Sequence, residues 1–172
     1  MQKVNSYSES SAFHSDMHIP ENIYSQIVSL MPIPCVDLLV EDERGRILLI
    51  KRANEPAKGH WWFPGGRVHY LEKRMQAAKR KLKEECGLEV FQMKEMGTYD
   101  ILLDMPGDEK SRHGITTLFH IRVKNQGNIT LDAQGLDSQW RMPEKWMCEK
   151  LHSFIVQGIT ILSENLDAKH VR

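Results

Sequence analysis

The sequence predicts a single α/β domain in which helices cover the faces of a mixed sheet. Short stretches with strand-like alternation and longer stretches with apolar residues at helical spacing follow one another along the chain. Such an alternation favours an α/β sandwich. A chain of 172 residues, 41% hydrophobic and 27% charged, is long enough for one domain with a sizeable core and is ordinary for a globular protein.

The chain begins with a polar segment and an amphipathic helix. Residues 1–18 are rich in Ser and His and poor in large aliphatic side chains, so we expect a mobile arm before a domain at 19–172. Pro20 suits the start of a helix, and apolar residues recur at helical spacing as far as Met31. The prolines that follow Met31 end that helix.

A hairpin and a short strand are predicted next. Apolar alternation predicts a strand over 35–41, a turn over 42–45 and a return strand over 46–52. After a loop, residues 61–63 form a short strand, and Pro64-Gly65-Gly66 turns sharply.

The middle of the chain carries a helix and further strands. Ala and Leu residues at helical spacing predict a helix over 73–86, and Gly87 lies where a glycine commonly ends a helix. Strands are expected at 88–93, 96–103 and 115–123, with a polar loop between the last two.

The C-terminal part reads as a turn at 125–128 and a long helix over 144–165, loosened near Gly158. The apolar faces of this helix and of the helix at 20–31 are candidates for a homodimer interface, although core packing explains them equally well.

Composition favours a small-molecule ligand. The formal net charge is zero, so nothing global attracts nucleic acid or an anionic membrane. No apolar run approaches the roughly 20 residues of a membrane span, and the polar start does not resemble a signal peptide. Three cysteines without a C-x-x-C pair favour structural thiols and a cytoplasmic protein.

One segment predicts a metal site on chemical grounds. On the predicted helix, Lys81, Glu84 and Glu85 share one face. Two adjacent carboxylates near the negative end of a helix repel each other, and a bound Mg²⁺ or Mn²⁺ would relieve that repulsion. The upstream Gly65-Gly66 can present a backbone carbonyl without a side chain in the way.

The segment 66–88 resembles the Nudix box. That motif is Gly, five residues, Glu, seven residues, Arg-Glu, an aliphatic residue, any residue, Glu-Glu, any residue, Gly and an aliphatic residue. The chain has Gly66, Glu72 and then Arg80-Lys81-Leu82-Lys83-Glu84-Glu85-Cys86-Gly87-Leu88. Only Lys81 departs from the motif. The resemblance implies the Nudix α/β/α sandwich and a hydrolase of diphosphate-bridged nucleotides.

The resemblance also implies roles for the box residues. Glu85 resembles the principal metal ligand, Glu84 a second ligand or the holder of a metal-bound water, and the Gly66 carbonyl a third contact for Mg²⁺ or Mn²⁺. Glu72 and Arg80 resemble the pair that braces the loop against the helix.

Lys81 stands where most members have a glutamate that binds metal or orients the attacking water. An ammonium can do neither. We expect it to neutralise a neighbouring carboxylate or to meet a phosphate oxygen.

From about Pro34 to Trp140 the chain resembles the GDP-mannose mannosyl hydrolase branch of the family, which displaces GDP from the sugar carbon. Arg52 and Arg67 match its clamp for the diphosphate, and Asp37 matches an acidic residue that contacts nucleotide or sugar. Phe119 falls near a substrate-contacting tyrosine, with a core role equally compatible. Of the tryptophans at 61 and 62, at least one is expected in the core.

The general base is the open point. The branch has a Gln-His pair after its last sheet strand, and this chain has Gln134, a possible metal ligand, followed by Gly135. Glycine cannot accept a proton. His113, Asp132 and Asp137 are the alternative candidates, and without a substitute base the enzyme is expected to be slow.

Three functions therefore compete. The first is hydrolysis of a GDP-mannose-like nucleoside diphosphate sugar to sugar and nucleoside diphosphate. The second is a general Nudix pyrophosphohydrolase that cuts a nucleoside diphosphate linked to a small group, which Glu84 favours. The third is a nucleotide-sugar-binding module with weak catalysis, which Lys81 and Gly135 favour.

Overall fold

A computed structural model describes residues 19–55, 57–103, 112–124, 129 and 135–170. The predicted arm at 1–18, the turn at 125–128 and the segment with Asp132 and Gln134 lie outside the described residues. Within the described residues, seven strands and four helices form one α/β domain, which confirms the predicted fold class.

The strands are β1 (Ile33–Glu41), β2 (Ile47–Arg52), β3 (Trp61–Trp62), β4 (Gly65–Arg67), β5 (Gln92–Leu103), β6 (Arg112–Arg122) and β7 (Gly135–Arg141). The helices are α1 (Glu21–Leu30), α2 (Arg74–Cys86), α3 (Pro143–Trp146) and α4 (Ser153–His170). The main strand order is β3-β2-β1-β6-β5; β4 also pairs with β1 and β7 also pairs with β2.

The central strand β1 divides its pairing between two neighbours on one side. Its C-terminal end pairs with β2, whereas Cys35, Val36 and Asp37 pair with the short strand β4. On the other side β1 runs parallel to β6 along its whole length. The two ends of β1 therefore face different strands, and its N-terminal half is brought beside Gly65–Arg67.

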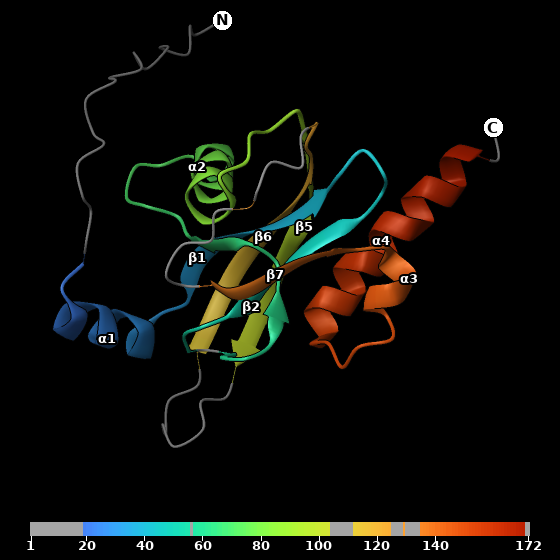
Figure 1. Ribbon diagram of the computed structural model, residues 1–172. Coiled ribbons are helices and arrows are strands. Elements are labelled where there is room, and N and C mark those ends of the chain that lie inside the picture. The colour runs from blue at the N-terminus through green and yellow to red at the C-terminus, as the bar shows by residue number, and fades with distance from the viewer. Residues whose placement is uncertain (1–18, 56, 104–111, 125–128, 130–134, 171–172) are drawn as a thin grey trace, which may run out of the picture.

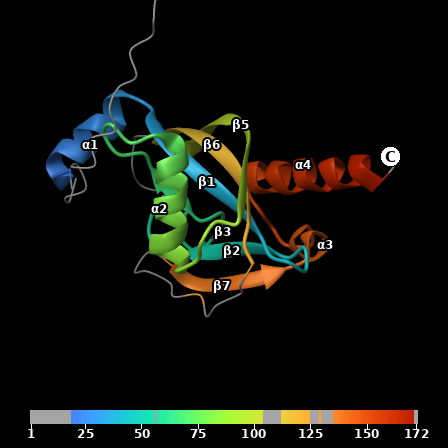
Figure 2. The same cartoon turned by 90° about the horizontal axis from the view of Figure 1, so that it is seen from above.

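Helices cover both faces of the sheet. Helix α2 lies on one face, and α3 and α4 lie against the other (Figures 1 and 2). Under α2, Ala77, Ala78 and Leu82 pack on Val36 and Leu38, whereas Phe154, Ile155 and Ile159 of α4 pack with residues such as Leu39 and Leu118. Because β1 is covered on both faces, Leu38, Leu39 and Val40 are all buried, and the simple alternation expected for it is lost.

Three predicted strand features differ in the structure. Residues 65–67 form strand β4 where a sharp turn was expected, because this segment pairs with β1. The strands expected at 88–93 and 96–103 are one strand, β5, which begins only at Gln92. The gap that the sequence suggested between these two strands corresponds to a register irregularity between Glu95 and Gly97, where Gly97 has φ +147°.

The C-terminal prediction was wrong in two respects. The sequence pattern missed β7, whose partner β2 is distant in sequence. The single helix expected over 144–165 is two helices, α3 and α4. Trp146 ends the first, where its ring is buried and its Nε1 donates to the carbonyl of Ile47.

Helix α4 continues through Gly158 without the expected loosening. A Cβ at this position would lie 3.0 Å from two carbons of the Phe63 ring and 3.1 Å from Leu118 Cδ2. The glycine therefore allows the helix to approach the sheet closely.

All three cysteines, Cys35, Cys86 and Cys148, are free thiols. Within the described part of the chain, no helix combines the length and the apolar character that crossing a membrane requires.

Gly158→Leu should lower the free energy of unfolding by about 2–3 kcal/mol, because its side chain must displace Phe63 and Leu118 in a packed core. Chemical denaturation measures the change. Thr160→Ala, on the exposed side of the same helix, should stay within about 0.5 kcal/mol of the wild type. Equal stability of the two variants would contradict the close packing.

Candidate functional site

The helix α2 presents the box carboxylates to strand β4. Ala77, Ala78 and Leu82 are buried against the sheet and fix the rotation of the helix. The helix ends at Gly87, whose φ of +68° is the left-handed conformation that glycine adopts readily. With the apolar face anchored, the side chains of Lys81, Glu84 and Glu85 lie together near the last turn.

An ion pair joins the loop before α2 to the helix. Arg80 Nε and Nη2 donate to the two carboxylate oxygens of Glu72 at 2.7 and 2.8 Å, and Nη2 also donates to the carbonyl of Arg67 at 3.1 Å. The backbone N–H of His69 donates to Glu72 as well. These contacts tie strand β4, the loop and the helix into one unit.

The electrostatics of this pair follow from its contacts. Burial alone would raise the pKa of Glu72, but the hydrogen bonds from Arg80 and His69 hold it below its ordinary value. The hydrogen bond to Glu72 raises the pKa of Arg80. Both groups are therefore charged near neutral pH.

The carboxylate of Glu85 lies between the helix and strand β4. Its Oε2 accepts a hydrogen bond from the backbone N–H of Gly65 at 2.9 Å, and its Oε1 lies 2.8 Å from Lys81 Nζ. Both side chains are nearly buried, with 10% of Lys81 and 8% of Glu85 exposed. Lys81 thus neutralises a box carboxylate, one of the two roles expected for it.

Glu84 is more accessible than Glu85. Its side chain is 46% exposed, and its Oε2 accepts from Arg80 Nη1 at 3.1 Å and from Lys81 Nζ at 3.4 Å. The two adjacent carboxylates are therefore compensated by two cations of the same helix.

Close contacts require glycine at the first two positions of β4, Gly65 and Gly66. A Cβ at Gly65 would lie 2.3 Å from the carbonyl oxygen of Val36, and a Cβ at Gly66 would lie 2.5 Å from Lys81 Cε. Gly66 also has φ +155°. Gly65 therefore admits the backbone of β1, and Gly66 admits the stem of Lys81.

Asp37 is buried on β1 next to this loop. Its Oδ1 accepts from Trp62 Nε1 at 3.1 Å and its Oδ2 from Thr116 Oγ1 at 2.6 Å. Burial raises its pKa to about 6; the two hydrogen bonds and the charge of Arg52 oppose that rise, and Glu85 adds to it. The carboxyl group of Asp37 thus lies within electrostatic range of Arg52 and Glu85.

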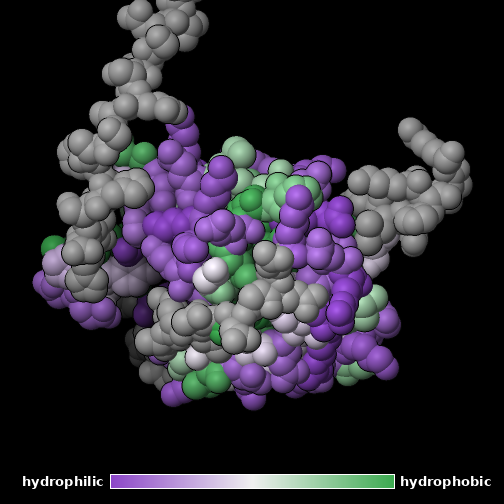
Figure 3. All heavy atoms as spheres, turned by 45° about the horizontal axis from the view of Figure 1, so that its top comes forward, coloured by the Kyte–Doolittle hydropathy of each residue, from purple (hydrophilic) through white to green (hydrophobic). Residues whose placement is uncertain are grey.

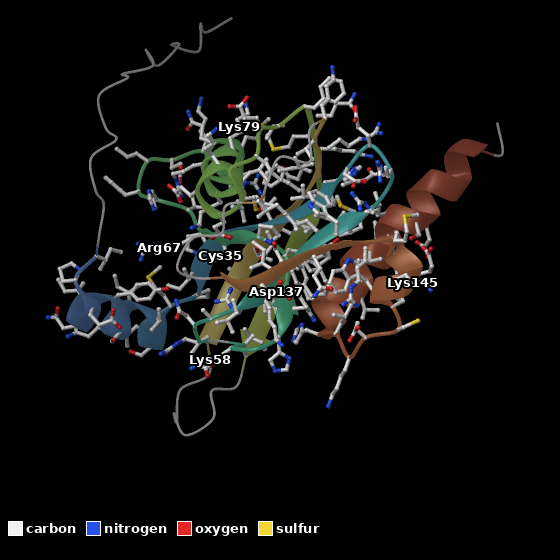
Figure 4. The ribbon with its side chains drawn as sticks, in the orientation of Figure 1. Cys35, Lys58, Arg67, Lys79, Asp137 and Lys145 are labelled. Atoms are coloured by element: carbon white, nitrogen blue, oxygen red, sulfur yellow. The ribbon has the colours of Figure 1, made fainter. Side chains whose placement is uncertain are left out.

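Arg67 lies opposite Cys35, two residues before Asp37. Cys35 pairs directly with Arg67 across β1 and β4, and Figure 4 shows these two residues close together. Burial and the charge of Asp37 raise the pKa of the Cys35 thiol to about 12, while the charges of Arg67, Arg52 and Lys81 act in the opposite direction. Of the two predicted clamp arginines, Arg67 is therefore placed beside β1 by strand pairing, and Arg52 is linked to this stretch of β1 by its charge.

The structure supports a core role for two aromatic residues. Phe119 is 1% exposed in the cluster under α2, so the core alternative describes it and a substrate contact does not. Trp62 is buried and orients Asp37. Trp61 is half-buried, with its ring 5.2 Å from that of Trp146.

The candidate bases are only partly described. His113 Nε2 lies 3.0 Å from Asp100 Oδ1 on the exposed side of β5 and β6. Asp137, on β7 (Figure 4), accepts from the Ser138 N–H and from Gln139 Nε2. Strand β7 starts at Gly135, which pairs with Arg52 of β2. Gln134 and Asp132 themselves are outside the described residues.

Two neighbours of the site were not predicted. Thr116 holds Asp37 from β6, and the ring of Tyr24 on α1 lies 4.9 Å from the guanidinium carbon of Arg67. Both contacts depend on strand and helix placement across long sequence separations. The local signal was the polar pair Thr116-Thr117 between the apolar residues Ile115 and Leu118.

The oxygen donors of the site are of the kind that a hard divalent cation prefers. Carboxylates and a backbone carbonyl are the ligands that Mg²⁺ and Mn²⁺ prefer. Among the described residues no group of three or more His, Cys, Asp or Glu side chains forms a metal cage. Glu84 and Glu85 are the side chains that would hold such an ion, and Lys81 lies within 3.4 Å of both.

Asp37→Asn should remove the contribution of this carboxyl group to the pH dependence of the free energy of unfolding. The folded state binds the Asp37 proton more tightly than the unfolded chain, so wild-type stability falls, relative to the variant, as pH rises from about 3.8 to about 6. The relative change is at most about 3 kcal/mol. Urea unfolding of both proteins at several pH values measures it. A difference that stays constant from pH 4 to 7 would show that Asp37 titrates normally.

The chain is similar to proteins of one known family. The NUDIX domain family matches residues 31–155. The Low-salt glycan biosynthesis protein Agl8 of Haloferax volcanii is 35% identical over 146 residues, 84% of this chain and 90% of that protein. The ADP-ribose pyrophosphatase of Methanocaldococcus jannaschii is 36% identical over 94 residues, 55% of this chain and 53% of that protein.

Solved structures show the same fold. The MutT protein from Methanosarcina mazei superposes with a TM-score of 0.66 at 22% identity, covering 79% of this chain and 97% of that one. The NUDIX domain of Shewanella oneidensis NrtR, in complex with ADP ribose, gives a TM-score of 0.66 at 20% identity over 86% and 99%. The family match over most of the chain, the shared architecture and the box helix agree, and the chain belongs to the Nudix hydrolase family.

Proposed function

We propose that the protein hydrolyses a nucleoside diphosphate sugar, GDP-mannose or a close relative, to sugar and nucleoside diphosphate with the help of Mg²⁺ or Mn²⁺. One observation carries this proposal: Arg67 lies on β4 opposite Cys35, two residues after Gly65, whose N–H binds the box carboxylate Glu85, and the charge of Arg52 acts on Cys35 and Asp37 of the same stretch of β1. Two fixed cations near an oxygen-rich metal site suit a diphosphate whose charge grows as it departs.

The relatives support the substrate class. Agl8, similar over 84% of this chain, is a glycan biosynthesis protein, and glycan synthesis uses activated sugars. Membership of the Nudix family supports hydrolysis of a nucleoside diphosphate derivative. The proposal adds that the group linked to the diphosphate is a sugar.

In this proposal each group of residues has its own role in binding or catalysis. Arg52 and Arg67 bind the diphosphate and stabilise it as a leaving group. Asp37 is buried and both of its oxygens already accept hydrogen bonds, from Trp62 and Thr116, so in this proposal it positions β1 beside the diphosphate site and does not contact the substrate directly. A divalent cation at Glu84 and Glu85 would add positive charge at the diphosphate.

Water activation is the weak step. His113 is hydrogen-bonded to Asp100, and Asp137 accepts hydrogen bonds from Ser138 and Gln139, so each is oriented within its own sheet region. A well-placed base contributes roughly 10²–10⁴ to the rate. We propose slow turnover, because both familiar bases, the box glutamate and the histidine of the branch, are replaced by Lys81 and Gly135.

A pyrophosphohydrolase is the second candidate. Glu84 favours it, since a second box carboxylate lies beside Glu85, and so does the similarity to an ADP-ribose pyrophosphatase. Cleavage between the phosphates would release nucleoside monophosphate.

We further propose a cytoplasmic protein that pairs as a homodimer without nucleic acid or membrane partners. The free thiols agree with a reducing compartment. Helix α1 exposes Ile23, Leu30 and Met31, whereas the apolar side of α4 is used in the core, so α1 is the better candidate for the dimer interface.

Hydrolysis of GDP-mannose in ¹⁸O-labelled water with Mg²⁺ tests the function. The proposal expects label on the sugar and GDP as the second product, because attack at carbon leaves the diphosphate whole. Label on phosphate together with GMP would instead establish the pyrophosphohydrolase. Binding of GDP-mannose without any turnover would leave only the weakly catalytic binding module.

Arg52→Ala and Arg67→Ala should each lower kcat/KM for the same substrate by about 10²-fold or more, because each removes a cation from the leaving group. Arg44→Ala, in the exposed turn between β1 and β2, serves as the matched control and should retain wild-type kinetics. Equal behaviour of all three variants would contradict the clamp.

A further inference from the structure

The ammonium group of Lys81 is built into the site. The stem of Lys81 passes over Gly66 so closely that a Cβ there would lie 2.5 Å from Lys81 Cε. Its side chain is 10% exposed, which is unusual for a lysine and implies that its charge is compensated. The partners are Glu85 at 2.8 Å and Glu84 at 3.4 Å. The position between the carboxylates is thus already taken by a cation.

Lys81 already contacts both carboxylates at the end of α2. Its Nζ lies 2.8 Å from Glu85 and 3.4 Å from Glu84, and Arg80, which is also paired with Glu72, lies 3.1 Å from Glu84. A divalent cation that enters must share the carboxylates with Lys81 or displace it. Either route weakens metal binding, since like charges are then close in a poorly hydrated site.

Lys81 lies beside the predicted clamp residue Arg67. Its stem passes over Gly66, the residue before Arg67 on β4, and Gly66 pairs with Val36 of β1. The charges of Arg67, Arg52 and Lys81 all oppose the raised pKa of Cys35, the residue of β1 opposite Arg67. The face that includes α2 is largely hydrophilic around a smaller apolar centre (Figure 3). The lysine of α2 and the arginine of β4 therefore lie along one short stretch of β1.

We propose that Lys81 is a resident cation that replaces a metal ion at Glu85 and contacts the diphosphate of the ligand, so that nucleoside diphosphate binds without divalent metal. This inference rests on the proposed function, because it assigns a further residue to the same diphosphate site. A divalent cation that takes part in hydrolysis would have to share Glu84 and Glu85 with Lys81 or displace it, and it is not required for binding.

The first test is GDP binding by calorimetry, with Mg²⁺ and with EDTA. Wild-type affinity in EDTA should be within about fivefold of that in Mg²⁺. Lys81→Met should lose about tenfold or more in EDTA, the range expected for one charge-assisted hydrogen bond. Lys83→Met, an exposed lysine of the same helix, is the control and should match the wild type. Wild-type binding that disappears in EDTA would overturn the proposal.

The second test is Mn²⁺ binding, followed by electron paramagnetic resonance without nucleotide. Lys81→Met should bind Mn²⁺ about tenfold more tightly than the wild type, and Lys81→Arg should remain weak. Unchanged Mn²⁺ affinity in Lys81→Met would show that the ammonium does not occupy a metal position.

A third variant guards against misfolding. Lys81→Met leaves the nearly buried carboxylate of Glu85 without its cation, which can destabilise the fold. The double variant Lys81→Met/Glu85→Gln removes both charges and keeps side chains of similar shape. It should fold, and it should lose GDP affinity in EDTA as the single variant does; retained affinity would contradict a contact between Lys81 and the diphosphate. Both titrations are independent of turnover, so GDP binding can succeed while GDP-mannose hydrolysis fails, and the reverse.

Discussion

The buried carboxylate of Glu85 is the constraint on which the site depends. It binds the backbone N–H of Gly65 on one side and the ammonium of Lys81 on the other. A nearly buried charge is tolerated only when its oxygens are satisfied. Strand β4, helix α2 and the lysine stem must therefore keep fixed relative positions, and the Glu72–Arg80 pair ties the connecting loop to the same unit.

Strand β1 supplies the other half of the site. It carries Cys35 and Asp37 beside β4, and the missing side chain of Gly65 lets the two backbones approach. Asp37 is kept in place by donors from β3 and β6. Because these strands are packed between α2 and α4, the core and the site share one framework, and the positions of the arginines follow from the sheet.

The parts of the molecule that the sequence could predict are those set by local pattern. Helices α1 and α2, the hairpin of β1 and β2 and the box itself follow from spacing and from residues such as Gly87. The start of β5, strand β7 and the break between α3 and α4 were missed, because they depend on partners far away in the chain. The same holds for the site: the role of Lys81 as a neutralising cation was predictable, whereas the contacts Thr116–Asp37 and Tyr24–Arg67 required the fold.

In the proposed complex, cations of the chain beside Glu85 bind the diphosphate, with at most one metal ion. A crystal structure with GDP and Mn²⁺, with diffraction data collected at the manganese absorption edge, tests this arrangement. We expect phosphate oxygens within hydrogen-bond distance of Arg52, Arg67 and Lys81, and no more than one anomalous peak at the carboxylates. Two or more manganese peaks around Glu85, with Lys81 turned away from the phosphates, would contradict it.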